Sequence, residues 1–300
     1  MKYTFFLLLF IHALAAQDHQ LIEIAEASYS PAEKLMLKKV QEPKSLYQIW
    51  PDDGKRADDP AKGLQEQGVV KGVLRISNVD RPTLTWVKPE KPDGRAILIC
   101  PGGGYNILAA THEGSDVASW LAKQGITPFI LKYRVPRRKG LDKHKVALED
   151  SQRAMSLIRF HAKSFGIDKN KVGILGFSAG GHLSTLTSVQ QRSYKTIDDA
   201  DKENCLPNFA VLIYAAYTGD KKTREIDPLL KPTRKIPILS VIGSKDTNFL
   251  PGLDAYVRYL QKNNVPIQHS VYDGIGHGVG LVGKVWQKDC EAWLKELKLP

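Results

Sequence analysis

A serine flanked by glycines is the residue whose setting most favours nucleophilic chemistry. The stretch "GFSAGGH" places Ser178 between Gly176 and Gly180, directly after the apolar run "KVGIL", and a helix is predicted to start next. Glycines on both sides of a sharp strand-to-helix turn remove side chains that would clash, so the serine hydroxyl is left accessible. The helix N-terminus adds partial positive charge beneath it. This pattern predicts that Ser178 is a nucleophile.

A serine hydroxyl attacks only when a base takes its proton, and a third group must orient that base. His277 follows the predicted strand "PIQHSVY" in a glycine-rich loop, and Asp246 follows the predicted strand "IPILSVIG". Because parallel strands end at one common edge of a sheet, we expect Ser178, His277 and Asp246 to meet there. Asp273, in the loop of His277, and Asp254, in a predicted helix, are the alternatives to Asp246.

The other histidines fit the role of base less well. They lie in the N-terminal segment, in predicted helices or in a predicted strand: His12, His19, His112, His144, His161, His182 and His269. His182 stands one helical turn after Ser178, where we expect it to pack against its neighbours. We therefore expect His277 to be the base.

The glycines of "PGGGY" follow an apolar strand predicted over residues 95–100, and their N–H groups could face an anion. A dinucleotide site would need the spacing G-x-G-x-x-G and an acidic residue about 20 residues further on, and a phosphate loop would need GK[ST]. The sequence has none of these here. Attack of a serine on an acyl carbon creates an oxyanion, which needs preorganised N–H donors. We expect one donor from Ala179 and the others from the loop at 101–104.

Strands and helices alternate along the chain from about Gly72 onward. Strands are predicted over residues 73–79, 83–89, 95–100, 126–133, 171–177, 209–216, 236–243 and 266–272, and helices over residues 112–125, 141–165, 179–189, 253–264 and 285–298. This alternation predicts one α/β domain with a mostly parallel sheet, because a hairpin cannot join parallel strands. No helix separates the first two strands, so we expect them to pair antiparallel at one edge. We expect the polar segment 190–208 to form a rim or flap.

Charge and cysteine content narrow the classes of partner. The 300 residues carry a net charge of +11, but basic side chains alternate with carboxylates and form no aromatic-interleaved stripe, which argues against nucleic acid as a partner. The three cysteines, Cys100, Cys205 and Cys290, lie far apart without metal-ligand spacing. We expect buried free thiols, no metal and no cofactor.

The N-terminus has the features of a targeting segment. Residues 1–16, "MKYTFFLLLFIHALAA", combine a lysine, a short apolar run and small residues, which predicts a signal peptide and a secreted or periplasmic protein. Residues 17–70 are predicted to be a polar N-terminal extension, and residues 71–300 the catalytic domain. The apolar run is shorter than the roughly 18 residues that span a bilayer, so we expect no stable membrane insertion. The sequence leaves the oligomeric state open.

These motifs together resemble those of the α/β-hydrolase superfamily. The resemblance runs from about Val73 to the C-terminus and rests on "PGGGY", "HEGSDVASWL", "LKYRVP", "LEDSQRAMSLIRFHAKSFGID", "GFSAGGHL", "GSKD" and "GIGHG". It implies the α/β-hydrolase fold, a mostly parallel twisted sheet with an antiparallel edge and helices on both faces. Within the superfamily, the chain is most similar to secreted bacterial esterases that remove acetyl or hydroxycinnamoyl groups from xylan-type polysaccharides. The lipase branch usually has His before its glycines and Asp before its serine, where this chain has Pro101 and Phe177.

The resemblance also implies which groups hold the oxyanion. Gly103 and Gly104 would donate their N–H groups to it, together with Ala179. A register one residue later would use Gly104 and Tyr105 instead. The glycine run is therefore expected to hold a transient anion.

Three aromatic or imidazole side chains near the predicted site loops are expected to line the substrate pocket: Tyr105, His112 and Tyr217. Taken together, these features predict a serine esterase that acts on a small-molecule or oligosaccharide ester. The alternatives are a general carboxylesterase or lipase-like enzyme, a serine peptidase of the prolyl-oligopeptidase kind, and a hydrolase-fold binding protein without catalytic activity.

Overall fold

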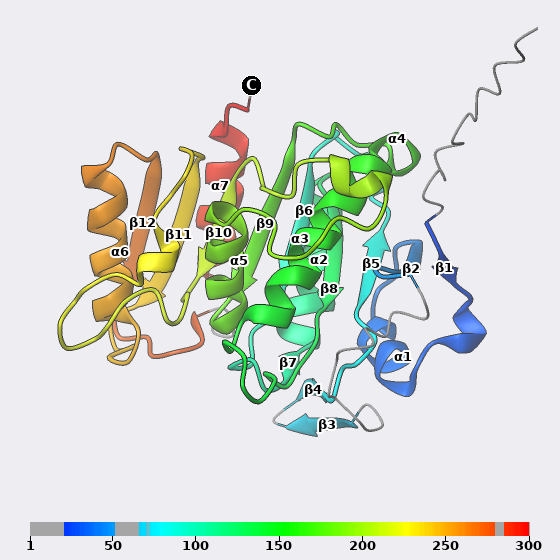
Figure 1. The fold of residues 1–300 in the computed structure, drawn as a ribbon, viewed down its shortest axis with the longest axis horizontal. Coiled ribbons are helices and arrows are strands. Elements are labelled where there is room, and N and C mark those ends of the chain that lie inside the picture. The colour runs from blue at the N-terminus through cyan, green and yellow to red at the C-terminus, as the bar shows by residue number, and fades with distance from the viewer. Residues whose placement is uncertain (1–20, 52–65, 71, 280–284, 300) are drawn as a thin grey trace, which may run out of the picture.

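The computed structural model describes residues 21–51, 66–70, 72–279 and 285–299, so the predicted signal peptide (1–16) lies outside the described residues. Within these ranges, nine strands form a central sheet (Figure 1). In sheet order they are β1 (Glu23–Ile24), β2 (Lys44–Gln48), β5 (Thr83–Val87), β8 (Thr127–Lys132), β6 (Ala96–Cys100), β9 (Val172–Phe177), β10 (Ala210–Ile213), β11 (Ile238–Gly243) and β12 (Ile267–Tyr272).

The sheet is parallel from β8 to β12 and antiparallel at the edge formed by β1, β2 and β5. Every residue of β6, β8, β9 and β10 is buried, which explains why these strands are continuous apolar runs in the sequence. The predicted fold class, a mostly parallel sheet with an antiparallel edge, is confirmed.

Helices cover both faces of the sheet (Figure 1). On one face, α3 (Lys145–Phe160) packs against α5 (Ala179–Val189). On the other face, α2 (Asp116–Lys123) meets α7 (Val285–Glu296), where the rings of Trp120 and Trp286 lie 5.3 Å apart. A further helix, α6 (Leu250–Lys262), packs against β12. The three cysteines are buried and form no disulfide.

The two early strands do not pair with each other, so the expected antiparallel pair at the edge is wrong. Instead, β4 (Val73–Ser77) lies between β3 (Glu66–Val70) and β7 (Leu108–Ala109) in a separate three-stranded sheet, while β5 pairs with β2 and β8. After β4, Asn78 takes a positive φ of 51° and Val79 bridges to Val135, which leads the chain from the small sheet to the central one. In Figure 1 the small sheet lies below the central sheet.

Within the predicted polar extension (17–70), residues 21–51 contribute the strands β1 and β2 to the central sheet, and residues 66–70 form β3 of the small sheet. The helix α1 (Pro31–Leu37) starts with a capping box between Ser30 and Glu33, after the short turn η1 (Glu26–Ser28). The Glu33 carboxylate also lies 2.6 Å from the buried Lys132 ammonium of β8. Trp50 donates a 2.7 Å hydrogen bond from its indole N–H to Asp150 of α3. These contacts fix residues 21–51 against the core.

Two other predicted segments differ in the structure. The helix predicted over residues 141–165 begins only at Lys145 and is interrupted at His161, leaving α3 and a short α4 (Ala162–Phe165). The polar segment 190–208, which contains the turn η4 (Asp199–Lys202), packs against α3. It is held there by Arg153, whose guanidinium lies 2.5 Å from Asp198 and 2.9 Å from Asp201. The short turn η5 (Pro228–Leu230) packs against α5.

Candidate active site

Ser178 lies at the turn between β9 and α5 with a strained backbone, at φ 50° and ψ −117°. The two neighbouring glycines are required by close packing. A Cβ on Gly176 would collide with the carbonyl oxygen of Gly180, and a Cβ on Gly180 would collide with the carbonyl oxygen of Cys100. The local geometry therefore holds the Ser178 hydroxyl out over the carboxyl end of the sheet, as the sequence pattern predicted.

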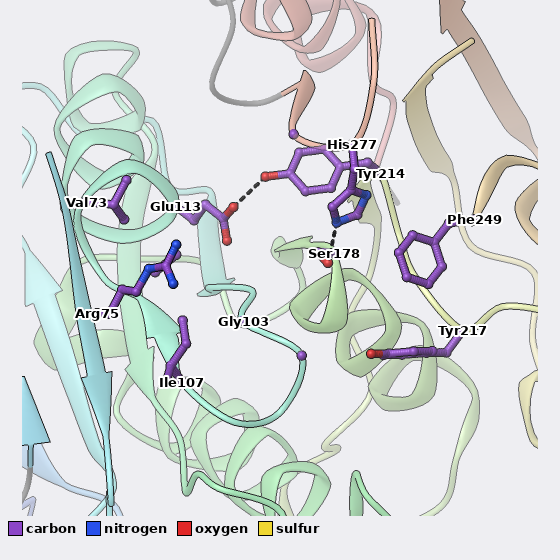
Figure 2. A pocket seen from close by; sticks show the side chains of 13 residues that line it. Val73, Arg75, Gly103, Ile107, Glu113, Ser178, Tyr214, Tyr217, Phe249 and His277 are labelled. Atoms are coloured by element: carbon purple, nitrogen blue, oxygen red, sulfur yellow. Dashed lines mark hydrogen bonds between the residues drawn. The ribbon is translucent and has the colours of Figure 1, made fainter. Parts of the chain in front are cut away.

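The structure brings His277 and Asp246 to this serine. The Nε2 atom of His277 lies 2.9 Å from the Oγ atom of Ser178 (Figure 2). The Nδ1 atom of His277 lies 2.6 Å from Oδ2 of Asp246. Asp246 follows β11 and is only 2 % exposed. The imidazole packs between the rings of Tyr214 and Phe249, each with its centroid 4.9 Å away. In this arrangement His277 can take the proton of Ser178 while Asp246 fixes the orientation of the ring.

The two alternative carboxylates make other contacts. Asp273 accepts a 3.0 Å hydrogen bond from the hydroxyl of Ser244. Asp254 lies 3.6 Å from Nε2 of His269, on α6 and β12. The geometry therefore favours Asp246 as the partner of His277.

The glycine loop after β6 approaches Ser178 closely. The N–H of Gly102 donates a 2.6 Å hydrogen bond to Oε2 of Glu113, so this N–H is not available to a ligand. Gly103, at φ 140°, could not carry a side chain, because a Cβ there would collide with the carbonyl oxygen of Ile107. Gly103 and Gly104 line the cavity beside Ser178. Their N–H groups, with that of Ala179 in the first turn of α5, are the candidates to hold an oxyanion.

The predicted pocket residues lie in different environments. Tyr217 lines the cavity beside Ser178. Tyr105 is buried instead, with its hydroxyl 2.8 Å from Nδ1 of His182, and does not line this cavity. His112 is also outside the lining, and its Nδ1 lies 3.4 Å from Asp116.

Glu113 is a site residue that sequence reasoning missed. It lies in the π-helical turn η3 (Thr111–Ser115), is 6 % exposed and lines the cavity. Its Oε1 accepts a 2.5 Å hydrogen bond from the hydroxyl of Tyr214, and its Oε2 accepts the bond from Gly102. Burial raises the pKa of Glu113. The two hydrogen bonds lower it, but by less than burial raises it. In the sequence, Glu113 appears only as part of an amphipathic helix.

The cavity has a volume of about 430 Å³, within the range of small-molecule sites. Figure 2 shows its two walls. Val73, Arg75 and Ile107 line one side, and Tyr214, Tyr217 and Phe249 line the other. Within the described residues, no cluster of three or more metal-ligating side chains is found, and no helix is long and apolar enough to cross a membrane.

A mostly parallel sheet with a strained serine between strand and helix, and with the histidine and acid after later strands, defines the α/β-hydrolase superfamily. The chain belongs to this superfamily, as its motifs predicted. Residues 86–220 match the family BD-FAE.

Two relatives are similar in sequence over part of the chain. An acetylxylan esterase from Xylanibacter ruminicola is 36% identical over 162 residues, which cover 54% of this chain and 31% of the relative. An endo-1,4-beta-xylanase B from Butyrivibrio fibrisolvens is 39% identical over 207 residues, which cover 61% of this chain and 32% of the relative. This chain therefore matches about a third of the length of each relative.

Solved structures support the fold over most of the chain. An acetyl ester-xyloside bifunctional hydrolase from Caldicellulosiruptor lactoaceticus has a TM-score of 0.66 and 26% identity, covering 84% of this chain and 96% of its own. A thermophilic esterase from Thermogutta terrifontis has a TM-score of 0.60 and 22% identity, covering 81% of this chain and 94% of its own, and shows the fold alone.

Proposed function

We propose that this protein is a secreted or periplasmic serine esterase that removes short acyl groups, acetyl or hydroxycinnamoyl, from plant polysaccharides or oligosaccharides such as xylan. The observation that carries the proposal is the chain of contacts from Ser178 Oγ to His277 Nε2, at 2.9 Å, and from His277 Nδ1 to Asp246, at 2.6 Å. These distances are those of a nucleophile, its base and the group that orients the base.

In the first half-reaction, Oγ of Ser178 attacks the carbonyl carbon of the ester while Nε2 of His277 takes the hydroxyl proton. The buried carboxylate of Asp246 accepts a hydrogen bond from Nδ1–H and stabilises the imidazolium that forms. When the tetrahedral intermediate collapses, His277 gives its proton to the oxygen of the leaving alcohol. The acyl group then remains on Ser178.

The negative oxygen of the tetrahedral intermediate would be held by the N–H groups of Gly103, Gly104 and Ala179. Glu113 supports this loop from below, because it anchors the neighbouring N–H of Gly102 at 2.6 Å. With Gly102 bonded to Glu113 and Tyr105 outside the cavity, the register that uses Gly103 and Gly104 is favoured.

In the second half-reaction, water replaces the alcohol. His277 takes a proton from the water, which attacks the acyl-serine, and the same N–H groups hold the second oxyanion. His277 then returns the proton to Oγ as the carboxylic acid leaves.

The polysaccharide part of the proposal draws on the relatives. One is named as an acetylxylan esterase, one as a xylanase, and the structural neighbour as an acetyl ester-xyloside hydrolase. The aromatic wall of Tyr217 and Phe249 offers a surface on which a sugar ring can stack. The apolar run in residues 1–16 supports export from the cytoplasm.

The test compares substrates that differ in the acyl group. Purified protein is assayed for acetate and ferulate release from acetylated and feruloylated xylan oligomers, with a long-chain lipid ester and a peptide amide as comparators. We expect efficient release of acetate or ferulate and little turnover of the comparators. Preference for the lipid ester or the peptide would contradict the proposal.

A further inference from the structure

An arginine faces the cavity from the wall opposite the aromatic side chains. Arg75, in the middle of β4, lines the cavity, and Figure 2 shows it on the same side as Val73 and Ile107. Arg75 makes no ion pair and no hydrogen bond from its side chain to any residue that the structure describes. A guanidinium in a substrate cavity with its donors free is equipped to bind a ligand.

The neighbours of Arg75 in the small sheet leave room beside it. Across the strands, Arg75 pairs with Gly68 of β3 and with Ala109 of β7. Directly opposed residues of an antiparallel pair lie on the same face, where a carboxylate would normally be well placed to pair with an arginine. Here one neighbour has no side chain and the other has a methyl group. A Cβ added at Gly68 would meet nothing within 4 Å, so the space next to Arg75 is open.

The charges around the cavity favour an anion. Both carboxylate oxygens of Glu113 already accept hydrogen bonds, from Gly102 and from the hydroxyl of Tyr214. Beside the cavity, the ammonium of Lys143 lies 3.7 Å from the centroid of the Tyr217 ring. The chain as a whole carries a net charge of +11, which adds long-range attraction for anionic ligands.

We propose that Arg75 binds a carboxylate on the sugar part of the substrate, so that the preferred substrates are acylated oligosaccharides substituted with a uronic acid. A guanidinium matches a carboxylate with two parallel N–H···O bonds. The inference rests on the proposed function: because the short acyl group has no carboxylate, the anion must belong to the alcohol. Arg75 is exposed, so its guanidinium is accessible to a substrate that enters the cavity between Val73 and Ile107.

The test uses two acetylated xylo-oligosaccharides of equal length, one with and one without a uronic acid next to the acetylated residue. We expect the kcat/KM for acetate release to be about tenfold higher for the acidic substrate, as for one charged hydrogen-bonded pair. The preference should weaken as salt is added. The ratio of kcat/KM for the acidic substrate to kcat/KM for the neutral one should approach one in Arg75→Gln. The control Arg258→Gln, at an exposed position on α6, should keep the wild-type ratio.

A second variant tests the same contact without removing the arginine. Gly68→Asp places a carboxylate beside Arg75 in open space, and we expect it to compete with the substrate and reduce the ratio at an unchanged Tm. A wild-type ratio near one, or a full preference retained by Arg75→Gln, would overturn the inference while leaving the esterase proposal intact. No acetate release from either substrate by the wild type would overturn both.

Discussion

Glu113 joins two parts of the candidate site that are distant in sequence. One oxygen holds the Gly102 N–H of the glycine loop, and the other accepts the hydroxyl of Tyr214, whose ring packs against His277. A single buried carboxylate thus positions both the glycine loop that we propose holds the oxyanion and the aromatic side chain beside His277, the proposed base. Glu113 acts through these neighbours, which makes it a positioning residue.

Replacing Glu113 with Gln should slow the reaction and leave substrate binding nearly unchanged. Gln offers one oxygen and one amide nitrogen, so when its oxygen accepts from Gly102 its nitrogen must donate to the Tyr214 hydroxyl, which reverses that hydrogen bond. We expect kcat on p-nitrophenyl acetate to fall about tenfold, as for the replacement of one buried hydrogen bond to a carboxylate by a weaker neutral one, with KM within about twofold. Steady-state kinetics check this, and an unchanged kcat would show that Glu113 does not position the loop.

The same variant should change how stability depends on pH. Burial raises the pKa of Glu113 above its ordinary 4.5, so the folded protein retains a proton that the unfolded chain loses. The stabilising contribution of Glu113 to the free energy of unfolding is therefore fully present below pH 4.5. It is lost as the pH rises through the pKa that Glu113 has in the folded protein. Since Gln does not titrate, we expect the Tm of Glu113→Gln relative to wild type to increase between pH 4.5 and 7. A constant difference in calorimetry would contradict a raised pKa.

Single residues were predictable where the signal is local. Ser178 is marked by glycines within two positions, and the loops of Asp246 and His277 follow recognisable strands. Glu113 and Tyr214 carry no comparable signal, because their hydrogen bond joins residues 101 positions apart. A strained backbone such as that of Tyr214, at φ 38°, also cannot be recognised from residue type.

The contact between α3 and the segment 190–208 depends on a buried ionic cluster. Arg153 of α3 has a fully buried side chain and contacts Asp198 and Asp201, and Asp201 also accepts hydrogen bonds from Tyr194 and Arg192. This cluster ties a polar segment to the helix that supports α5. The sequence of segment 190–208 has the polar composition of an exposed flap. The arginine that buries its carboxylates, Arg153, lies on α3 and cannot be recognised from the segment alone.

Arg153→Ala should be strongly destabilising, because it leaves buried carboxylates without their guanidinium. We expect the free energy of unfolding to fall by about 3–5 kcal/mol, measured by chemical denaturation. Lys202→Ala in the same segment is the control: its ammonium pairs with Asp199 but is largely exposed, so a change below about 1 kcal/mol is expected. Similar losses in both variants would mean that burial does not decide the effect.

The positions of the strands were predicted more reliably from the sequence pattern than the pairing between strands. The buried strands β6, β8 and β9 are continuous apolar runs, and each appears in the structure within one or two residues of the predicted bounds. The pairing of β4 and β5 was wrong because their true partners, β7 and β2, are short or polar segments elsewhere in the chain. Pairing of this kind depends on the assembled core.

The molecule as a whole depends on its N-terminal residues. Glu33 places a carboxylate 2.6 Å from the buried Lys132, Trp50 bonds to Asp150, and β2 covers the edge of β5. Removal of this segment would take the carboxylate from a buried ammonium and expose a strand edge.

A chain that begins at residue 71 should therefore fail to fold, whereas one that begins at residue 21 should keep the wild-type Tm. Near-UV circular dichroism and thermal unfolding distinguish the two. As a point variant, Glu33→Gln should lower the free energy of unfolding by about 3 kcal/mol, because it breaks a buried ion pair. Folding of the chain from residue 71 with an unchanged Tm would contradict this role.

The most direct test of the esterase mechanism is to trap the acyl carrier. Purified protein is treated with a fluorophosphonate and with p-nitrophenyl acetate, and the modified residue is located by mass spectrometry of its peptides. We expect one adduct on Ser178, and at least a thousandfold loss of turnover in Ser178→Ala, about the scale for removal of a serine nucleophile. An adduct on another residue, or more than a few per cent of wild-type turnover in Ser178→Ala, would contradict the mechanism.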